Sequence, residues 1–159
     1  MDGLRIVIGS DEAGYEYKEV LRNDLLAHPA VSEVTDLGVE AGQVAAYPSI
    51  AVAAGERIAA GEADRGLLVC GTGLGMAIAA NKVRQIRAVT AHDSYSVERA
   101  VLSNNAQILT MGQRVVGIEL ARRLMREWLT YRFDESTASA DKVRIIEDYE
   151  AREHVQIDE

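Results

Sequence analysis

The sequence predicts an α/β fold in which a parallel sheet of five strands carries helices on both faces. Short apolar runs rich in β-branched residues alternate along the chain with longer segments of helical spacing. Such alternation favours parallel strands, because each helix returns the chain to the edge where the previous strand began. The run Gly66–Cys70 is apolar throughout, as expected of a central strand covered on both faces. The 159 residues suit one domain, which we expect to span residues 1–159.

Three strands and two helices are expected in the first half of the chain. The strands are Leu4–Ile8, Val31–Leu37 and Gly66–Cys70. Apolar residues at helical spacing predict a helix over Tyr15–His28, which Pro29 ends. An alanine-rich helix is expected over Ser49–Gly61 after a loop at 42–47, with Pro48 in its first turn.

The second half continues the same alternation. Strands are expected at Ile86–Thr90 and Ala106–Met111. Helices are expected at Met76–Lys82, Tyr95–Leu102, Ile118–Tyr131 and Val143–His154. Asp93 or Ser94 is a suitable cap for the second of these helices, and residues 134–141 form a polar hinge before the last.

The overall charge argues against several classes of partner. A formal net charge of −8 repels nucleic-acid phosphates and anionic lipid, so neither nucleic acid nor a membrane is expected as a partner. One cysteine allows no internal disulfide. The first residues lack the pattern of a signal peptide, and no apolar stretch is long enough to span a bilayer, so we expect a cytoplasmic protein.

Polar residues and glycines follow the predicted strands at the edge where ligands bind in open parallel sheets. The most informative segment is Gly71-Thr72-Gly73-Leu74-Gly75, here called the glycine loop. Its bare N–H groups and the start of the next helix suit a phosphate or a developing enediolate oxygen. A tight turn that binds nothing explains the pattern equally well. A dinucleotide site is less favoured, because the spacing is G-x-G-x-G and the loop follows the third strand.

Cys70 stands directly before the glycine loop, where a thiol can act as a base or a nucleophile. A small buried core residue is the commoner fate of a lone cysteine. Asp11 and Glu12 suit binding of hydroxyls or proton transfer, and equally a helix N-cap. Arg114 and Lys142 can hold phosphate, although solvated surface charge is the commoner role of a basic residue.

The three histidines include His92, which is more typical of a loop residue than of a catalyst. None of them lies at metal-ligand spacing from another, so no metal site is expected.

Several segments together resemble the ribose-5-phosphate isomerase B and galactose-6-phosphate isomerase family. Val69–Lys82, Val-Cys-Gly-Thr-Gly-Leu-Gly-Met-Ala-Ile-Ala-Ala-Asn-Lys, is similar to the family signature. Other matches are Gly9–Gly14, Tyr47-Pro48, Ile86–Val89, Asn104 and Met111–Gly117. The resemblance covers about residues 4–150. It implies a Rossmann-like three-layer α/β/α sandwich that catalyses aldose–ketose isomerisation of sugar phosphates, an intramolecular oxidoreduction, without a cofactor.

The resemblance also implies roles for single residues. Cys70 would be the base that moves a proton between C1 and C2, since Met76 stands where another branch has a glutamate. Thr72 matches the residue that helps to open the sugar ring. The N–H groups of Gly71, Gly73 and Gly75 would stabilise the cis-enediolate.

Substrate contacts and assembly are implied in the same way. Asp11 would bind hydroxyls and Tyr47 would line the pocket. A homodimer or a dimer of dimers with shared active sites is implied, in which a C-terminal helix over about 138–153 packs on the partner subunit.

Three departures from the family pattern bear on the substrate. Glu12 and Ser103 each stand where the family has a histidine, beside Asp11 and Asn104. The C-terminal helix of the family has two arginines for phosphate, and at these positions this chain keeps one cation, Lys142. Arg114 would therefore contribute more to phosphate binding. The histidine missing at 103 is associated with ring opening, and a tetrose bearing phosphate on O4 cannot close a furanose ring. We therefore expect a tetrose/tetrulose 4-phosphate, such as erythrose/erythrulose 4-phosphate, with ribose 5-phosphate/ribulose 5-phosphate as the conventional alternative.

Two other classes of function remain open at this point. A non-catalytic phosphate- or nucleotide-binding module is compatible with a Rossmann-like sheet, because the fold alone does not determine function. A thiol redox protein is disfavoured, because Cys70 has no resolving cysteine in the same chain.

Overall fold

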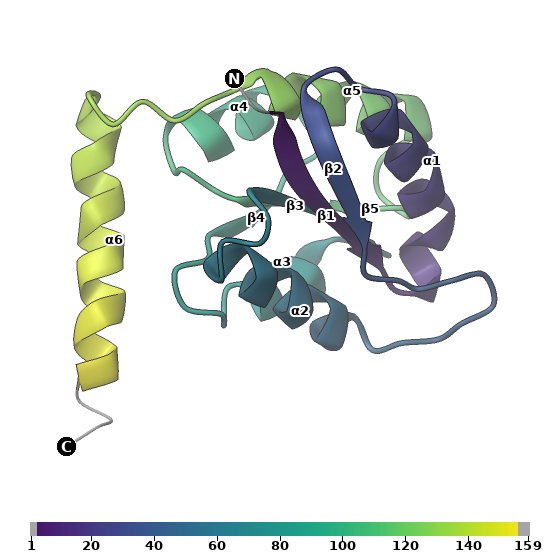
Figure 1. Cartoon of the computed structure of the whole chain (residues 1–159), viewed down its shortest axis with the longest axis horizontal. Helices are drawn as coiled ribbons and strands as arrows, with labels where there is room; N and C mark the ends of the chain where they lie inside the picture. Colours follow the sequence, from purple (N-terminus) through teal and green to yellow (C-terminus); the bar gives the residue numbers. More distant parts are fainter. Residues whose placement is uncertain (1–2, 156–159) are drawn as a thin grey trace.

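A computed structural model describes residues 3–155 and shows one parallel sheet between two helical layers (Figure 1). The strands are β1 (Leu4–Ser10), β2 (Val31–Asp36), β3 (Arg65–Cys70), β4 (Ala88–Thr90) and β5 (Ile108–Gly112). All pairs are parallel, and the order across the sheet is β2-β1-β3-β5-β4. The predicted α/β class and the five-stranded parallel sheet are confirmed.

The helices divide between the two faces of the sheet. One face is covered by α1 (Tyr15–Leu26), α4 (Ser94–Leu102) and α5 (Ile118–Thr130), and the other by α2 (Tyr47–Ala59) and α3 (Leu74–Ala80). A 3-10 turn, η1 (Glu12–Gly14), joins β1 to α1. The last helix, α6 (Ala138–Val155), is not part of either layer. None of the helices between residues 3 and 155 is long and apolar enough to cross a membrane.

Some predicted boundaries differ from the structure for local reasons. Helix α3 begins at Leu74 rather than Met76, because Gly73 adopts a left-handed conformation that starts the helix at once. Strand β4 begins at Ala88 rather than Ile86, and it lies at the edge of the sheet. Helix α6 includes Ala138–Asp141, because the polar hinge ends in a turn in which the Asp134 carboxylate accepts from the N–H of Ser136.

The sheet register brings the ends of three strands to the same level. Ser10 at the end of β1 pairs with Val69, and Cys70 at the end of β3 pairs with Gly112 at the end of β5. Residues that follow these strands therefore meet at the carboxyl edge of the sheet, as the sequence predicts.

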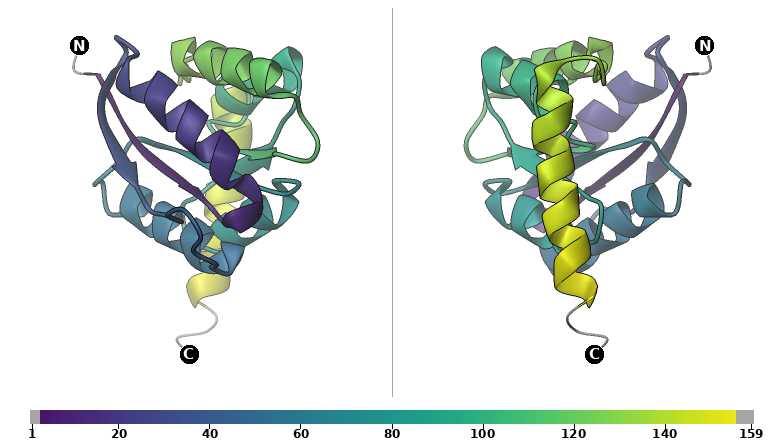
Figure 2. Two further views of the ribbon diagram at one scale, coloured as in Figure 1. Left: turned by 90° about the vertical axis from the view of Figure 1, so that its right-hand side faces the viewer. Right: turned by 90° about the vertical axis from the view of Figure 1, so that its left-hand side faces the viewer.

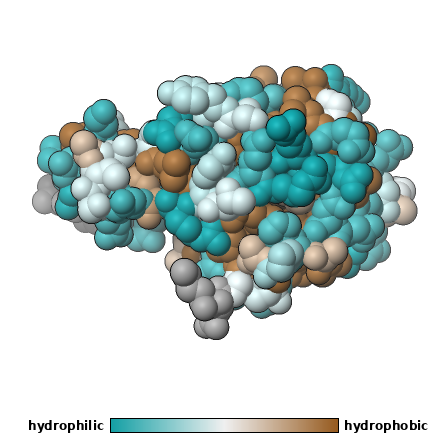
Figure 3. Space-filling view, turned by 90° about the horizontal axis from the view of Figure 1, so that it is seen from above, coloured by the Kyte–Doolittle hydropathy of each residue, from teal (hydrophilic) through white to brown (hydrophobic). Residues whose placement is uncertain are grey.

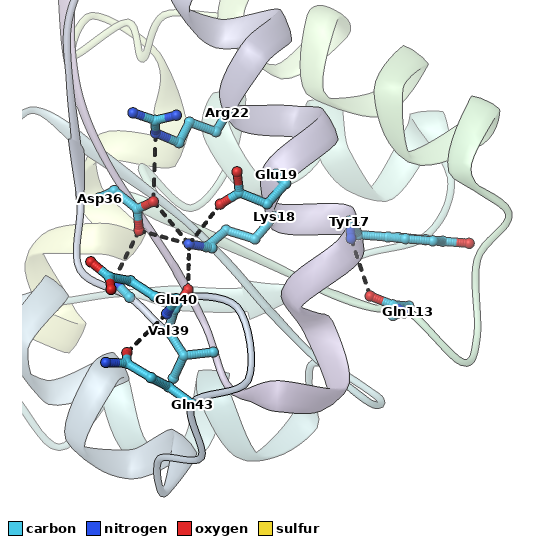
Figure 4. A network of polar contacts seen from close by, with 10 residues as sticks. Tyr17, Lys18, Glu19, Arg22, Asp36, Val39, Glu40, Gln43 and Gln113 are labelled. Carbon is cyan, nitrogen blue, oxygen red and sulfur yellow. Dashed lines mark hydrogen bonds and ion pairs between the residues drawn. The ribbon is translucent and has the colours of Figure 1, made fainter.

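A buried lysine fixes the chain where it leaves β2 (Figure 4). Lys18 of α1 is 1% exposed, and its Nζ lies 2.8 and 3.0 Å from the two carboxylate oxygens of Asp36. It also donates to the carbonyl of Val39 at 2.7 Å and pairs with Glu19 at 3.1 Å. A buried ammonium needs such partners, since losing water without them is costly. The network holds the start of the segment that leads to Tyr47 on α2.

Helix α6 stands beside the body of the protein rather than on the sheet (Figure 2), and from above it forms a separate lobe (Figure 3). Arg87 pairs with Glu147 of α6 at 3.3 Å, and the N–H of Gln85 donates to Glu150 at 2.9 Å. Val143 is buried on the inner side. The exposed apolar residues of α6 are Ile145, Ile146 and Tyr149, at 68%, 52% and 65%. Apolar exposure of this extent on one helix is typical of an interaction surface.

Candidate functional site

The glycine loop folds back on the thiol that precedes it. Cys70 ends β3, and three residues later the N–H of Gly73 donates to the Cys70 sulfur at 3.0 Å. Gly73 has φ +81°, which glycine adopts without the steric cost that other residues meet. The Thr72 hydroxyl oxygen accepts from the N–H of Leu74 at 3.2 Å, a local bond within the loop.

Close packing explains why the loop contains glycines. A Cβ on Gly73 would lie 2.9–3.1 Å from the backbone of Met111, and a Cβ on Gly75 would lie 2.5 Å from the ring of Tyr47. A Cβ on Gly71 would lie 3.4 Å from the Arg114 guanidinium. The loop is therefore enclosed by the end of β5, the Tyr47 ring and the Arg114 side chain.

Cys70 is both a buried residue and a hydrogen-bond acceptor. It is 4% exposed and belongs to the apolar cluster between the sheet and the α2–α3 layer. Its sulfur nevertheless accepts a main-chain N–H, so apolar groups are not its only neighbours.

The loop after β5 is joined to the glycine loop by main-chain hydrogen bonds. The N–H of Gln113 donates to the Cys70 carbonyl at 2.9 Å, and that of Arg114 donates to the Gly71 carbonyl at 3.0 Å. His92, which follows β4, accepts the N–H of Gly112 through Nε2 at 2.9 Å. Burial lowers the pKa of His92, and the nearby Asp93 carboxylate opposes this shift. The histidine is thus kept in the neutral form that can accept a hydrogen bond.

Asp11 is both a cap and a member of the site. Its Oδ1 accepts from the N–H groups of Ala13 and Gly14 at 3.0 and 3.2 Å, so the N-cap role is confirmed. Burial raises the pKa of Asp11 and the Glu12 carboxylate adds to the rise, whereas the two backbone bonds and the positive charge of Arg114 lower it. Asp11 and Arg114 are therefore close enough to interact, and Oδ2 is a second acceptor on the same carboxylate.

Glu12 and Tyr47 border the same region from the α2 side. A carboxylate oxygen of Glu12 accepts from the N–H of Ala45 at 3.4 Å, two residues before Tyr47. Tyr47 is 40% exposed and packs its ring on Gly75. The site predicted from the sequence is thus assembled at the carboxyl edge from Cys70, Asp11, Glu12, Tyr47, Arg114 and the glycine loop.

Three predicted residues lie elsewhere in the chain. The carbonyl of Asn104 accepts from Arg87, which directly precedes β4, and Ser103 accepts from Arg99. Because β4 is parallel to β3, this is the amino edge of the sheet, opposite Cys70. Lys142 is exposed on α6, which is anchored at the same amino edge. Within one chain, these residues do not join the site.

Three further residues support the site and were not identified from the sequence as doing so. Thr90 and Thr110 contact the Gly73 carbonyl, and His92 holds the backbone of Gly112. A threonine inside the otherwise apolar run Ile108–Met111 was the available signal, because a buried hydroxyl needs a partner. Within the part of the chain that the structure describes, no three histidine, cysteine or acidic residues are grouped to hold a metal ion.

Fold and site together define a class: α/β proteins with a parallel sheet whose carboxyl edge carries one thiol beside a glycine-rich loop. A family model described as Ribose/Galactose Isomerase matches residues 6–146, and the chain belongs to this family. The family prediction made from the sequence is confirmed.

Two curated relatives and a solved structure show the extent of the similarity. The chain is 63% identical to D-erythrulose-4-phosphate isomerase 2 of Mycolicibacterium smegmatis, over 92% of this chain and 97% of the relative. It is 44% identical to ribose-5-P isomerase B of Listeria innocua, over 94% and 99%. The type B ribose 5-phosphate isomerase of Leishmania infantum has a TM-score of 0.90 at 35% identity, covering 95% and 99% of the two chains.

Proposed function

We propose that the protein interconverts an aldose phosphate and its ketose through a cis-enediolate, with erythrulose 4-phosphate as its ketose substrate. The observation that carries the proposal is the hydrogen bond from the Gly73 N–H to the Cys70 sulfur beside the glycine loop. Membership in the isomerase family supports catalysis over the alternative of a non-catalytic binding module.

The chemistry follows from the arrangement of the residues. The Cys70 thiolate removes a proton from the carbon next to the substrate carbonyl, and charge moves onto the oxygen to form the enediolate. The N–H groups of Gly71 and Gly75 stabilise that oxygen, whereas the Gly73 N–H, which the sequence also suggested for this role, is bonded to the Cys70 sulfur. The Cys70 thiol then returns the proton to the neighbouring carbon, so the same sulfur starts and completes the reaction. The exposed Thr72 hydroxyl moves the proton between the two substrate oxygens.

Substrate contacts are assigned to the side chains around the loop. Asp11 accepts hydrogen bonds from hydroxyls through Oδ2, Glu12 takes a hydroxyl beside it, and Tyr47 closes the side of the pocket. Arg114 provides a guanidinium that binds phosphate. A tetrulose 4-phosphate is open-chain, which suits a chain with Ser103 where the family has the histidine associated with ring opening.

The proposal includes a second copy of the chain in each complete site. Ser103, Asn104 and Lys142 lie at the amino edge, where they cannot reach the thiol of their own chain. The exposed apolar residues of α6 suit burial against another subunit. We therefore assign a homodimer or a dimer of dimers, in which residues 138–153 of α6 pack on the partner and the three polar residues enter its site. The cytoplasm is the proposed compartment, since phosphorylated sugars do not cross bilayers unaided.

A panel of sugar phosphates assayed with a chelator tests the function and the substrate together. We expect turnover that survives chelation, with a higher kcat/KM for erythrulose 4-phosphate than for ribose 5-phosphate. A much higher kcat/KM for ribose 5-phosphate would overturn the tetrose assignment and leave the isomerase assignment standing. No turnover of any aldose or ketose phosphate would overturn both.

A further inference from the structure

The carbonyl of Gly73 is held by two threonine hydroxyls from adjacent strands. Thr110 of β5 lies 2.8 Å from this oxygen and Thr90 of β4 lies 3.1 Å from it. Thr90 and Thr110 pair directly in the β4–β5 ladder, and their hydroxyl oxygens are 2.7 Å apart. The three oxygens therefore form one compact cluster beneath the glycine loop.

The two hydroxyls have only two protons for three close contacts. One proton bonds the Gly73 carbonyl and the other bonds between the hydroxyls, so the pair acts as a unit. Thr110 is fully buried, with no exposed surface, and a hydroxyl in that position costs free energy unless it is bonded. Two threonines in an otherwise apolar region are therefore matched to this one carbonyl.

Gly73 links the two threonines to the thiol. Its N–H is the group that donates to the Cys70 sulfur, and its carbonyl is the group that the threonines hold. Glycine has few steric limits on φ and ψ, so the peptide groups on either side of Gly73 depend on their hydrogen bonds to keep this conformation. The first helical bond of α3, from the N–H of Ala77 at 3.2 Å, holds the same carbonyl more loosely.

We infer that Thr110 and Thr90 are positioning residues that hold Gly73 so that its N–H points at the Cys70 sulfur. They touch neither the thiol nor the substrate and act through Gly73. The catalytic consequence rests on the proposed function, whereas the effect on the thiol can be measured without any substrate.

The test compares Thr110→Val, which removes the hydroxyl at constant volume, with Thr110→Ser, which keeps it. We expect Thr110→Val to lower kcat about tenfold or more with little change in KM, since a donor to the reacting site becomes misaligned. The rate of Cys70 alkylation by iodoacetamide, measured at one fixed pH, should fall several-fold, because the sulfur loses the N–H donor aimed at it. Thr110→Ser should restore both properties to within a few-fold of the unmodified protein.

Matched variants separate positioning from general stability. Thr130→Val removes a threonine-to-carbonyl bond at the end of α5, where the hydroxyl donates to Glu127 at 2.7 Å, and should leave kcat and alkylation unchanged. Thr90→Val, on the half-buried edge strand, provides the same test if Thr110→Val does not fold. An alkylation rate unchanged in folded Thr110→Val or Thr90→Val would overturn the inference, whatever the activity. An unmodified protein without isomerase activity would overturn the proposed function and leave the alkylation test valid.

Discussion

The two ends of the sheet differ in how completely one chain builds them. At the carboxyl edge, the loops after β3 and β5 are joined by hydrogen bonds at Cys70, Gly71 and Gly73, and little space is left for a larger side chain. At the amino edge, α6 is attached to Arg87 and Gln85 and leaves its apolar residues exposed. The residues of the carboxyl edge pack against one another within the chain, whereas the apolar residues of α6 at the amino edge are exposed. The comparison shows that one chain packs the surroundings of its thiol by itself and leaves the apolar residues of α6 uncovered.

Replacing Gly73 should have the largest effect, because the carboxyl edge leaves it no room. Gly73→Ala places a Cβ against the Met111 backbone at φ +81° and displaces the N–H from the Cys70 sulfur. We expect a loss of about a hundredfold in kcat and a decrease in the free energy of unfolding of more than about 2 kcal/mol. Steady-state kinetics and urea denaturation measure the two effects.

Gly61→Ala is the matched control for this change. Gly61 has φ +74°, almost the same backbone conformation, but nothing lies within 4 Å of its Cβ position. It should cost about 1 kcal/mol and leave kcat unchanged. Equal losses of activity in the two variants would show that close packing at the carboxyl edge is not what matters.

Mixing two inactive variants tests whether the amino edge of one chain completes the site of another chain. Cys70→Ala lacks the base, and the double variant Asn104→Ala/Lys142→Ala lacks the residues offered by the amino edge. If sites are shared, co-expressed chains form heterodimers with one complete site, and activity should return to about a quarter of the unmodified level. A mixture no more active than its components, or full activity in the double variant alone, would contradict shared sites.

Lys18 tests whether the loop before Tyr47 must be fixed. Lys18→Met keeps most of the side-chain volume but removes the ammonium from Asp36 and Val39, so we expect a loss of about 3 kcal/mol in unfolding free energy. KM should rise several-fold as Tyr47 moves. Arg22→Met is the control, because Arg22 reaches the same Asp36 at 3.5 Å from a half-buried position and should cost less than about 1 kcal/mol. Equal effects of both changes would remove the special role of the buried lysine.

The smallest expected effect is a pH dependence at His92. Burial lowers the pKa of His92 below 6.5, so the folded protein favours the neutral ring that accepts the Gly112 N–H. The stabilisation is present above pH 6.5 and is lost as the pH falls through the lowered value. His92→Gln retains an acceptor without this titration, and thermal unfolding between pH 5 and 8 should show a shallower acid-side decline. An unaltered decline would assign the acid sensitivity to other groups.

Much of the carboxyl edge could be predicted from the sequence, because strand ends and glycines are local signals. The apolar run Gly66–Cys70 and the glycine loop after it predict a thiol next to N–H donors, and the structure contains that arrangement. Asp11 was expected as either a cap or a ligand, and the structure shows the cap directly.

The supporting contacts could not be predicted in the same way, because they depend on strand order. Thr90 and Thr110 become neighbours only when β4 pairs with β5, and Lys18 meets Asp36 only when α1 packs beside β2. The separation of Asn104 from Cys70 is likewise a property of topology, since it depends on which end of the sheet each segment reaches.

Solvent deuterium incorporation during the reaction tests the central claim most directly. The unmodified protein isomerises erythrulose 4-phosphate in D₂O, and mass spectrometry should find carbon-bound deuterium in the sugar product. The reason is that the thiol exchanges with solvent while it holds the transferred proton. Cys70→Ala should bind the sugar phosphate by calorimetry yet introduce no deuterium and form no product. Product and deuterium formed at an unchanged rate by Cys70→Ala would contradict the assignment of the base.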